Sequence, residues 1–214
     1  MNARMRGRWP GVVASVAVLV AVTATWIAVE STGPEAPAAS HGADLGASTT
    51  VTVTTLPVVP ESCSLVTAAT LAAHLPGAVC RPPVVATQQY GGGLVMTMAD
   101  WQGHAGEGSL VALEVRVTIA PATASTTYAN SRAAAAAVFP TFHDGVDGRE
   151  LAGVGDQAAV IGGRCRPGPG CFDAQVDAMA GPVVVDVLAG GFGDVAAAEA
   201  AAVAAARDAL AAPR

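Results

Sequence analysis

The fold is decided by one stretch in the middle of the chain, Leu113-Glu114-Val115-Arg116-Val117-Thr118-Ile119. Apolar and polar side chains alternate along it, and successive side chains of a β-strand point to opposite faces of a sheet. The apolar side chains therefore belong to a buried face and the polar ones to the opposite face. This pattern is typical of an antiparallel sheet with one covered side.

Weaker patterns on both sides of this stretch complete the predicted elements. The predicted helices run from the N-cap Thr67 to Leu75, from about residue 122 to residue 138 before Pro140, and from the N-cap Asp194 to Leu210. The further predicted strands are residues 94–98, 157–161, 174–178 and 183–187, the last two facing each other across Gly181-Pro182. This order predicts an α+β fold, an antiparallel sheet with helices packed on one face.

The beginning of the chain predicts a membrane anchor. Arg4, Arg6 and Arg8 precede an uncharged run, Trp9–Val29, which Glu30 closes. A helix rises about 1.5 Å per residue, so about twenty such residues cross the hydrocarbon core. The arginines favour a cytoplasmic N-terminus. We therefore expect one transmembrane helix at the cell membrane and an exported remainder; a cleaved signal peptide is the alternative.

Composition changes along the chain predict four segments. These are a cytoplasmic N-terminus at 1–8, a transmembrane signal anchor at 9–30, an Ala/Pro/Thr-rich extracytoplasmic linker at 31–60, and an exported domain at 61–214. The net charge of −6 argues against a nucleic-acid partner.

All four cysteines follow the predicted anchor, where disulfides persist. Four cysteines allow three pairings, and proximity in sequence favours Cys63–Cys80 and Cys165–Cys171. A zinc site made of the four cysteines is the alternative. Neither pair has the usual spacing of zinc-binding cysteines, so the disulfides are favoured.

No motif of the chain predicts catalysis or cofactor binding. Gly153-Val154-Gly155-Asp156-Gln157-Ala158 fits the dinucleotide fingerprint formally, but the glycines at 162 and 163 would break the helix that must follow. Asp144, Asp147 and Glu150 are interpreted as a solvated acidic loop, not a calcium site. Catalytic, cofactor-binding and metal-binding residues are therefore expected to be absent.

A hydrolase remains the first alternative. His104 and His143 lie in stretches read as Gly-rich loops, and Ser109 could in principle join either of them with an aspartate in a triad. The sequence alone does not show whether these residues meet in space, and it has no Gly-x-Ser-x-Gly elbow.

Three short motifs resemble an actinobacterial family of exported domains of unknown function, found mostly in lipoproteins. Cys63-Ser64-Leu65-Val66-Thr67 is similar to its Cys-x-Leu-Leu-Thr opening, Ala99-Asp100-Trp101 to its Cys-x-Trp strand, and residues 153–158 to its Gly-x-Gly-Asp-x-Ala motif. Two departures stand out. Ala99 replaces the usual partner of the first cysteine, so Cys80 would take that role, and a membrane helix replaces the lipoprotein box. The resemblance implies an α+β fold in the cell envelope and no activity.

The sequence thus predicts a membrane-anchored extracytoplasmic domain without enzymatic activity. Its role would be to bind a component of the cell envelope, either a protein or a lipid-like ligand, or to be structural. Besides the hydrolase, an accessory or sensor subunit acting through a partner membrane protein is the alternative.

Overall fold

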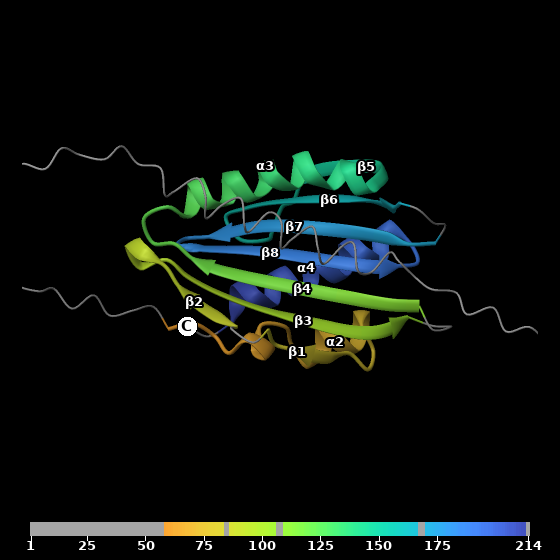
Figure 1. The fold of residues 1–214 in the computed structure, drawn as a ribbon, viewed down its shortest axis with the longest axis horizontal. Helices are drawn as coiled ribbons and strands as arrows, with labels where there is room; N and C mark the ends of the chain where they lie inside the picture. Colours follow the sequence, from red (N-terminus) through yellow and green to blue (C-terminus); the bar gives the residue numbers. More distant parts are fainter. Residues whose placement is uncertain (1–57, 84–85, 106–108, 167–169, 213–214) are drawn as a thin grey trace, which may run out of the picture.

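The computed structural model describes residues 58–83, 86–105, 109–166 and 170–212 (Figure 1). The elements in chain order are η1 (Ser62–Ser64), α2 (Ala68–His74), β1 (Val79–Arg81), β2 (Thr87–Gln89), η2 (Gly91–Gly93), β3 (Val95–Ala105), β4 (Ser109–Ile119), α3 (Ala124–Phe142), β5 (His143–Glu150), β6 (Gln157–Cys165), β7 (Phe172–Ala180), β8 (Val183–Phe192) and α4 (Val195–Ala211). The predicted anchor at 9–30 and nearly all of the linker lie outside these ranges. Within them, no helix is both long enough and apolar enough to cross a membrane.

One antiparallel sheet organises the domain. Its eight strands follow the order β1-β3-β4-β8-β7-β6-β5, and β2 pairs with β3 next to β1. The predicted α+β class with an antiparallel sheet is confirmed. The strand that decided the prediction, β4, lies inside the sheet between β3 and β8.

The first face of the sheet is covered by α4, with α2 and η1 beside it, and this face is largely apolar; the buried Thr97 lies on it opposite Val117. The valines of β4, β7 and β8 pack against a row of fully buried alanines on α4. These alanines are Ala198, Ala201, Ala202, Ala205, Ala206 and Ala209. Their spacing of three and four residues keeps them on one side of the helix. Because methyl groups are small, α4 can lie close to the valines, and Trp101 fills the space toward α2.

The second face of the sheet is covered by α3, so the prediction that all helices pack on one face is wrong. Ala124 and Tyr128 of α3 form a second core with Val184 and Met179. In Figure 1, α3 lies along β6 and β7 at the side of the sheet away from β3. The cause is the run Val183–Val187, in which valines occupy both faces of β8, so that both faces need a cover.

Several predicted elements are confirmed. Thr67 caps α2 by accepting a hydrogen bond from the backbone N–H of Thr70, and Asp194 caps α4 by accepting from that of Ala197. The β7–β8 hairpin turns at Gly181-Pro182 as expected, and it places Val176 opposite Val187.

Two boundaries differ from the prediction. Helix α3 continues through Pro140 to Phe142. Proline removes one helical N–H, and the carbonyl that loses its partner belongs to Ala136, which is exposed and can bind water. The stretch His143–Glu150, read as a loop, is the edge strand β5. Its glycines and charges hide the strand pattern, but such residues are common at sheet edges because they discourage pairing with other chains.

Candidate functional site

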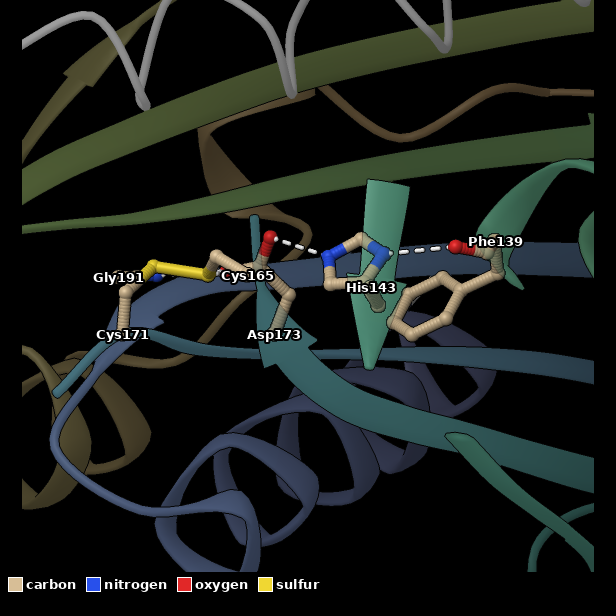
Figure 2. Close-up of a disulfide and its surroundings, with 6 residues drawn as sticks. All are labelled: Phe139, His143, Cys165, Cys171, Asp173 and Gly191. Carbon is tan, nitrogen blue, oxygen red and sulfur yellow. Dashed lines mark hydrogen bonds and ion pairs between the residues drawn. A yellow bond between two sulfur atoms is a disulfide. The ribbon is translucent and has the colours of Figure 1, made fainter. Parts of the chain in front are cut away.

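A buried histidine lies on the α3 side of the sheet beside a disulfide (Figure 2). The Nε2 atom of His143 is 2.8 Å from Oδ2 of Asp173, and its Nδ1 atom is 2.9 Å from the carbonyl oxygen of Phe139. Oδ1 of Asp173 is 3.2 Å from Sγ of Cys165 and 3.8 Å from Sγ of Cys171. We call His143, Asp173, Cys165 and Cys171 the histidine cluster.

The elements around it explain this convergence. His143 opens β5, Cys165 ends β6, and Asp173 follows Cys171 at the start of β7. His143 and Cys165 are direct cross-strand partners. Oδ1 of Asp173 also accepts a hydrogen bond from the backbone N–H of Gly191 at 2.9 Å, which fixes the carboxylate to β8.

This geometry does not make His143 a catalytic base. Both ring nitrogens are hydrogen-bonded to acceptors, Phe139 O on one side and Asp173 on the other. A serine-hydrolase triad needs one nitrogen on a carboxylate and the other on the serine hydroxyl. The carboxylate is present, but a backbone carbonyl occupies the position of the serine.

A second polar group is the acid pair, Asp177 and Asp186. They face each other directly across β7 and β8, and both are almost fully buried. Above them, Oγ of Ser131 on α3 is 2.9 Å from Oδ1 of Asp177 and in short contact with Oδ1 of Asp186. Gln175 donates to Asp177 at 3.0 Å.

The acid pair must hold a proton. Ser131 has one hydroxyl hydrogen and can donate it to only one carboxylate, so the other contact requires a proton on the second carboxyl group. Burial, and then the negative charge of Asp186, raise the pKa of Asp177 to about 8. Asp177 is therefore the protonated member at neutral pH. Because α3 covers the pair, a substrate could not reach this proton.

Arg116 lies next to the acid pair on the same face. Its Nη1 atom is 4.0 Å from Oδ2 of Asp186, a contact too long for a hydrogen bond. Its Nε and Nη2 atoms are buried and have no acceptor among the residues that the structure describes. Native proteins rarely leave such donors unsatisfied, so this guanidinium calls for an explanation.

Helix α3 does not extend over the part of this face around Arg116. Helix α3 packs on β5, β6, β7 and β8. Figure 1 shows β3 and β4 in the other half of the sheet, at a distance from this helix. Cross-strand register places Met98 beside Arg116 and Asp100 beside Glu114. We call Met96, Met98, Asp100, Gln102, Glu114 and Arg116 the β3–β4 surface; all six side chains are half-buried.

The glycine motif at residues 153–158 has a structural role. Gly155 has a positive φ of 61°, and a Cβ atom there would lie 2.4 Å from the carbonyl oxygen of Met179. Asp156 binds the β7–β8 turn twice, because its N–H donates to Met179 O and its carboxylate accepts from Gly181 N–H. Strand β6, not a helix, follows at Gln157, so the motif lacks the helix of a dinucleotide site.

Of the remaining residues considered from the sequence, His104 and Ser109 lie close together on the paired strands β3 and β4, where Ser109 is opposite Ala105. His104 lies on β3 and is exposed, Ser109 begins β4, and His143 begins β5 at the far edge. Four strand spacings of about 4.8 Å separate β4 from β5, so roughly 19 Å lie between Ser109 and His143. The proposed triad with His143 therefore does not form.

Two of the three acidic residues of β5 pair with arginines, and the third, Asp147, is exposed. Asp144 contacts Arg164 and Arg166, and Glu150 contacts Arg132 of α3. The two predicted disulfides, Cys63–Cys80 and Cys165–Cys171, are confirmed. Cys80 is thus the partner of the first cysteine, and it lies across from Trp101.

Sequence reasoning missed both buried polar groups. The acid pair had a signal: a two-residue turn at Gly181-Pro182, with Ala180 opposite Val183, places Asp177 opposite Asp186. The histidine cluster had none, because its members come from three strands and His143 was assigned to a loop. The chain matches no protein-family model, no curated protein and no solved structure.

Proposed function

We propose that this chain is a membrane-anchored extracytoplasmic domain that binds an envelope component without catalysis. The anchor is residues 9–30, with the N-terminus cytoplasmic and the α+β domain outside the cell membrane. Two disulfides support an exported domain, because disulfides are rare in cytosolic proteins. The uncharged run Trp9–Val29 after three arginines supports the anchor.

Membership in the actinobacterial exported family is part of this proposal. The Gly-x-Gly-Asp-x-Ala motif supports it, because Gly155 and Asp156 clamp the β7–β8 turn in a way that requires those residue types. Trp101 supports it as well, since it is a fully buried core residue beside Cys80.

The observation that carries a binding role is the unsatisfied guanidinium of Arg116. Two buried donor atoms, Nε and Nη2, point to an acceptor supplied from outside the described residues. Met96 and Met98 lie on the neighbouring strand of the β3–β4 surface. Methionine adapts its shape to apolar partners, so this surface suits an acceptor group attached to an apolar body.

The surrounding charges favour a neutral acceptor over an anion. Asp100, Glu114 and Asp186 lie on this face with two arginines, Arg81 and Arg116. Burial raises the pKa of Glu114, although the charge of Arg116 opposes this rise. An added anion would meet these carboxylates. An ester or amide carbonyl of a lipid-like ligand or a peptide would satisfy Arg116 without that repulsion.

Site-specific photocrosslinking in native membranes tests this function. A photoreactive residue replaces Met98, with a matched control at Ala137, an exposed residue of α3. We expect a defined adduct at position 98 and none at position 137. The substitution Arg116→Met should abolish the adduct, whereas Arg132→Met, on exposed α3, should leave it intact. Mass spectrometry of the adduct identifies a lipid-like ligand or a protein.

Equal labelling at both positions, or labelling unaffected by Arg116→Met, would contradict the proposal. The hydrolase alternative has its own result. It requires an ester or peptide hydrolysis by the purified full chain that Ser109→Ala or His104→Gln abolishes while the circular dichroism spectrum is unchanged.

The topology is tested separately. An enzyme reporter that is active only outside the cytoplasm, fused after Pro60, should be active, and the same reporter fused before Trp9 should be inactive. The reverse pattern would contradict the proposed orientation. A mature N-terminus found near Ala39 would show a cleaved signal peptide instead of an anchor.

A further inference from the structure

The histidine cluster contains four metal-ligand side chains: three come from strands β5, β6 and β7, and Cys171 lies just before β7. Ligand atoms of His143, Cys165 and Asp173 lie within 4.8 Å of one another, and this is the one such group among the described residues. Cys171 adds a second sulfur 3.8 Å from Oδ1 of Asp173. Figure 2 shows the disulfide on one side of Asp173 and the imidazole on the other.

The orientation of His143 is that of a metal-binding histidine. Its Nδ1–H donates to the backbone carbonyl of Phe139, which leaves Nε2 to face Asp173. A hydrogen bond of this kind fixes the tautomer and ring position of many metal-ligating histidines. The ring also stacks on Phe139, with centroids 3.8 Å apart and planes 12° apart. Imidazole position and tautomer are thus set before any metal arrives.

We propose that reduction of the Cys165–Cys171 disulfide creates a Zn²⁺ site formed by Cys165, Cys171, His143 Nε2 and the Asp173 carboxylate. Two sulfurs, one imidazole nitrogen and one carboxylate oxygen are ligands that Zn²⁺ accepts in tetrahedral sites. With Zn–S bonds of about 2.3 Å, the two sulfurs would be about 3.8 Å apart. Reduction removes the bond between the sulfurs, and rotation of the two cysteine side chains provides this separation.

The reaction balances with a dithiol as reductant. The dithiol transfers two electrons and two protons to the Cys165–Cys171 bond, is itself oxidised to a disulfide, and leaves two thiols in the protein. Zn²⁺ then displaces one proton from each thiol and the proton shared between His143 and Asp173. In the oxidised protein the same residues form a hydrogen-bonded structural unit, and in the reduced protein they hold the metal.

Cobalt titration of the purified full chain in detergent tests the site. Co²⁺ replaces Zn²⁺ and reports tetrahedral geometry and thiolate bonds through visible and near-ultraviolet absorption. After reduction with a phosphine, we expect one equivalent of Co²⁺ to bind with a thiolate charge-transfer band, and Zn²⁺ to displace it. The oxidised protein should show no such band.

Variants assign the ligands. Cys171→Ser should remove about half of the charge-transfer intensity per bound Co²⁺, because one of the two thiolate ligands is lost. His143→Gln should weaken binding at least tenfold, because the loss of a ligand should have at least the 10- to 100-fold effect of losing an outer residue. The double variant Cys63→Ala/Cys80→Ala is the matched control, because it removes the other disulfide and should bind as the wild type does. Circular dichroism of each reduced variant reports whether it is folded.

A measurement on the unmodified chain covers variants that fail to fold. Zn²⁺ should slow alkylation of Cys165 and Cys171 in the reduced protein at least tenfold, and leave Cys63 and Cys80 unaffected, as read by peptide mapping. Absence of a thiolate band in the reduced wild type, or protection that falls on Cys63 and Cys80, would overturn the proposal. So would unchanged binding in folded His143→Gln.

Discussion

The two faces of the sheet are built from the same strands but stabilised by different physics. On the α4 face, valines meet alanines, and the free energy comes from apolar area removed from water. On the α3 face, β7 and β8 carry the buried carboxylates of Asp173, Asp177 and Asp186, each held by directional hydrogen bonds. The first face should therefore respond to changes in volume, and the second to changes in proton or redox state.

The largest effect of a single substitution at a fixed pH is expected on the apolar face. Trp101 is 1% exposed, and Trp101→Ala should lower the free energy of unfolding by about 3–5 kcal/mol because it leaves a large cavity. Chemical denaturation followed by circular dichroism measures this loss. Phe142→Ala is the control, because Phe142 is exposed and its loss should cost under about 0.5 kcal/mol. Similar values for the two variants would contradict the assignment of this core.

The next largest effect is expected from the disulfides, which should contribute different amounts to the free energy of unfolding. Cys63–Cys80 closes a separation of 17 residues and Cys165–Cys171 one of 6. Loop-closure entropy predicts about 3 kcal/mol for the first and about 2 kcal/mol for the second. Cys63→Ala should therefore lower the melting temperature more than Cys165→Ala, with Cys80→Ala and Cys171→Ala matching their partners. The opposite ranking would show that the polar face depends on its disulfide more than chain entropy accounts for.

The polar face should respond to pH through Asp177. Its pKa is raised from 3.8 to about 8, so the folded state binds a proton that the unfolded state releases above about pH 4. The contribution of this group to stability is complete below pH 4 and is lost as pH rises to about 8, by on the order of 1 kcal/mol per pH unit. Asp177→Asn keeps a donor and cannot ionise, so its stability relative to the wild type should increase across this window.

Unfolding free energies at several pH values between 4 and 8 measure this difference. Asp147→Asn is the matched control, because Asp147 is exposed on β5 and its substitution should give a constant offset. A constant offset for Asp177→Asn as well would mean that the acid pair does not share a proton as described.

The smallest effects are expected at helix ends. Asp194 caps α4 on the apolar side, and Asp194→Ala should cost about 1 kcal/mol. Thr123 precedes α3 but makes no side-chain cap, so Thr123→Ala should change stability by less than about 0.5 kcal/mol. Equal costs for the two variants would show that cap geometry does not distinguish these helices. Thermal unfolding of both resolves the comparison.

Much of the apolar face could be predicted from the sequence, because it follows repeating patterns. The alternation in Leu113–Ile119, the valines of the hairpin at Gly181-Pro182 and the N-caps Thr67 and Asp194 all have local signals. The disulfides followed from proximity alone. These features depend on residues near one another in the chain.

The polar face could not be predicted in the same way. His143 and Asp173 are brought together by the order β5-β6-β7, which no local pattern encodes. The charges and glycines of edge strand β5 hide its strand pattern. Without a predicted β5, nothing in the sequence places His143 beside β6 and β7. The alternation in β4 predicts only that Arg116 lies on the face opposite the buried one, whereas its side chain is only 11% exposed. Long-range pairing decides these environments.

The Cys63–Cys80 bond also has a mechanical consequence if the chain is tethered as proposed. Tension arriving from the membrane side reaches Cys63 first and passes through the sulfur bridge to Cys80 in β1. The residues between them, α2 included, then lie outside the path of the force. The pull is transferred directly to the β1–β3 ladder beside Trp101. Severing this bridge would redirect tension through α2, and a short helix of 7 residues would be the first part to unravel.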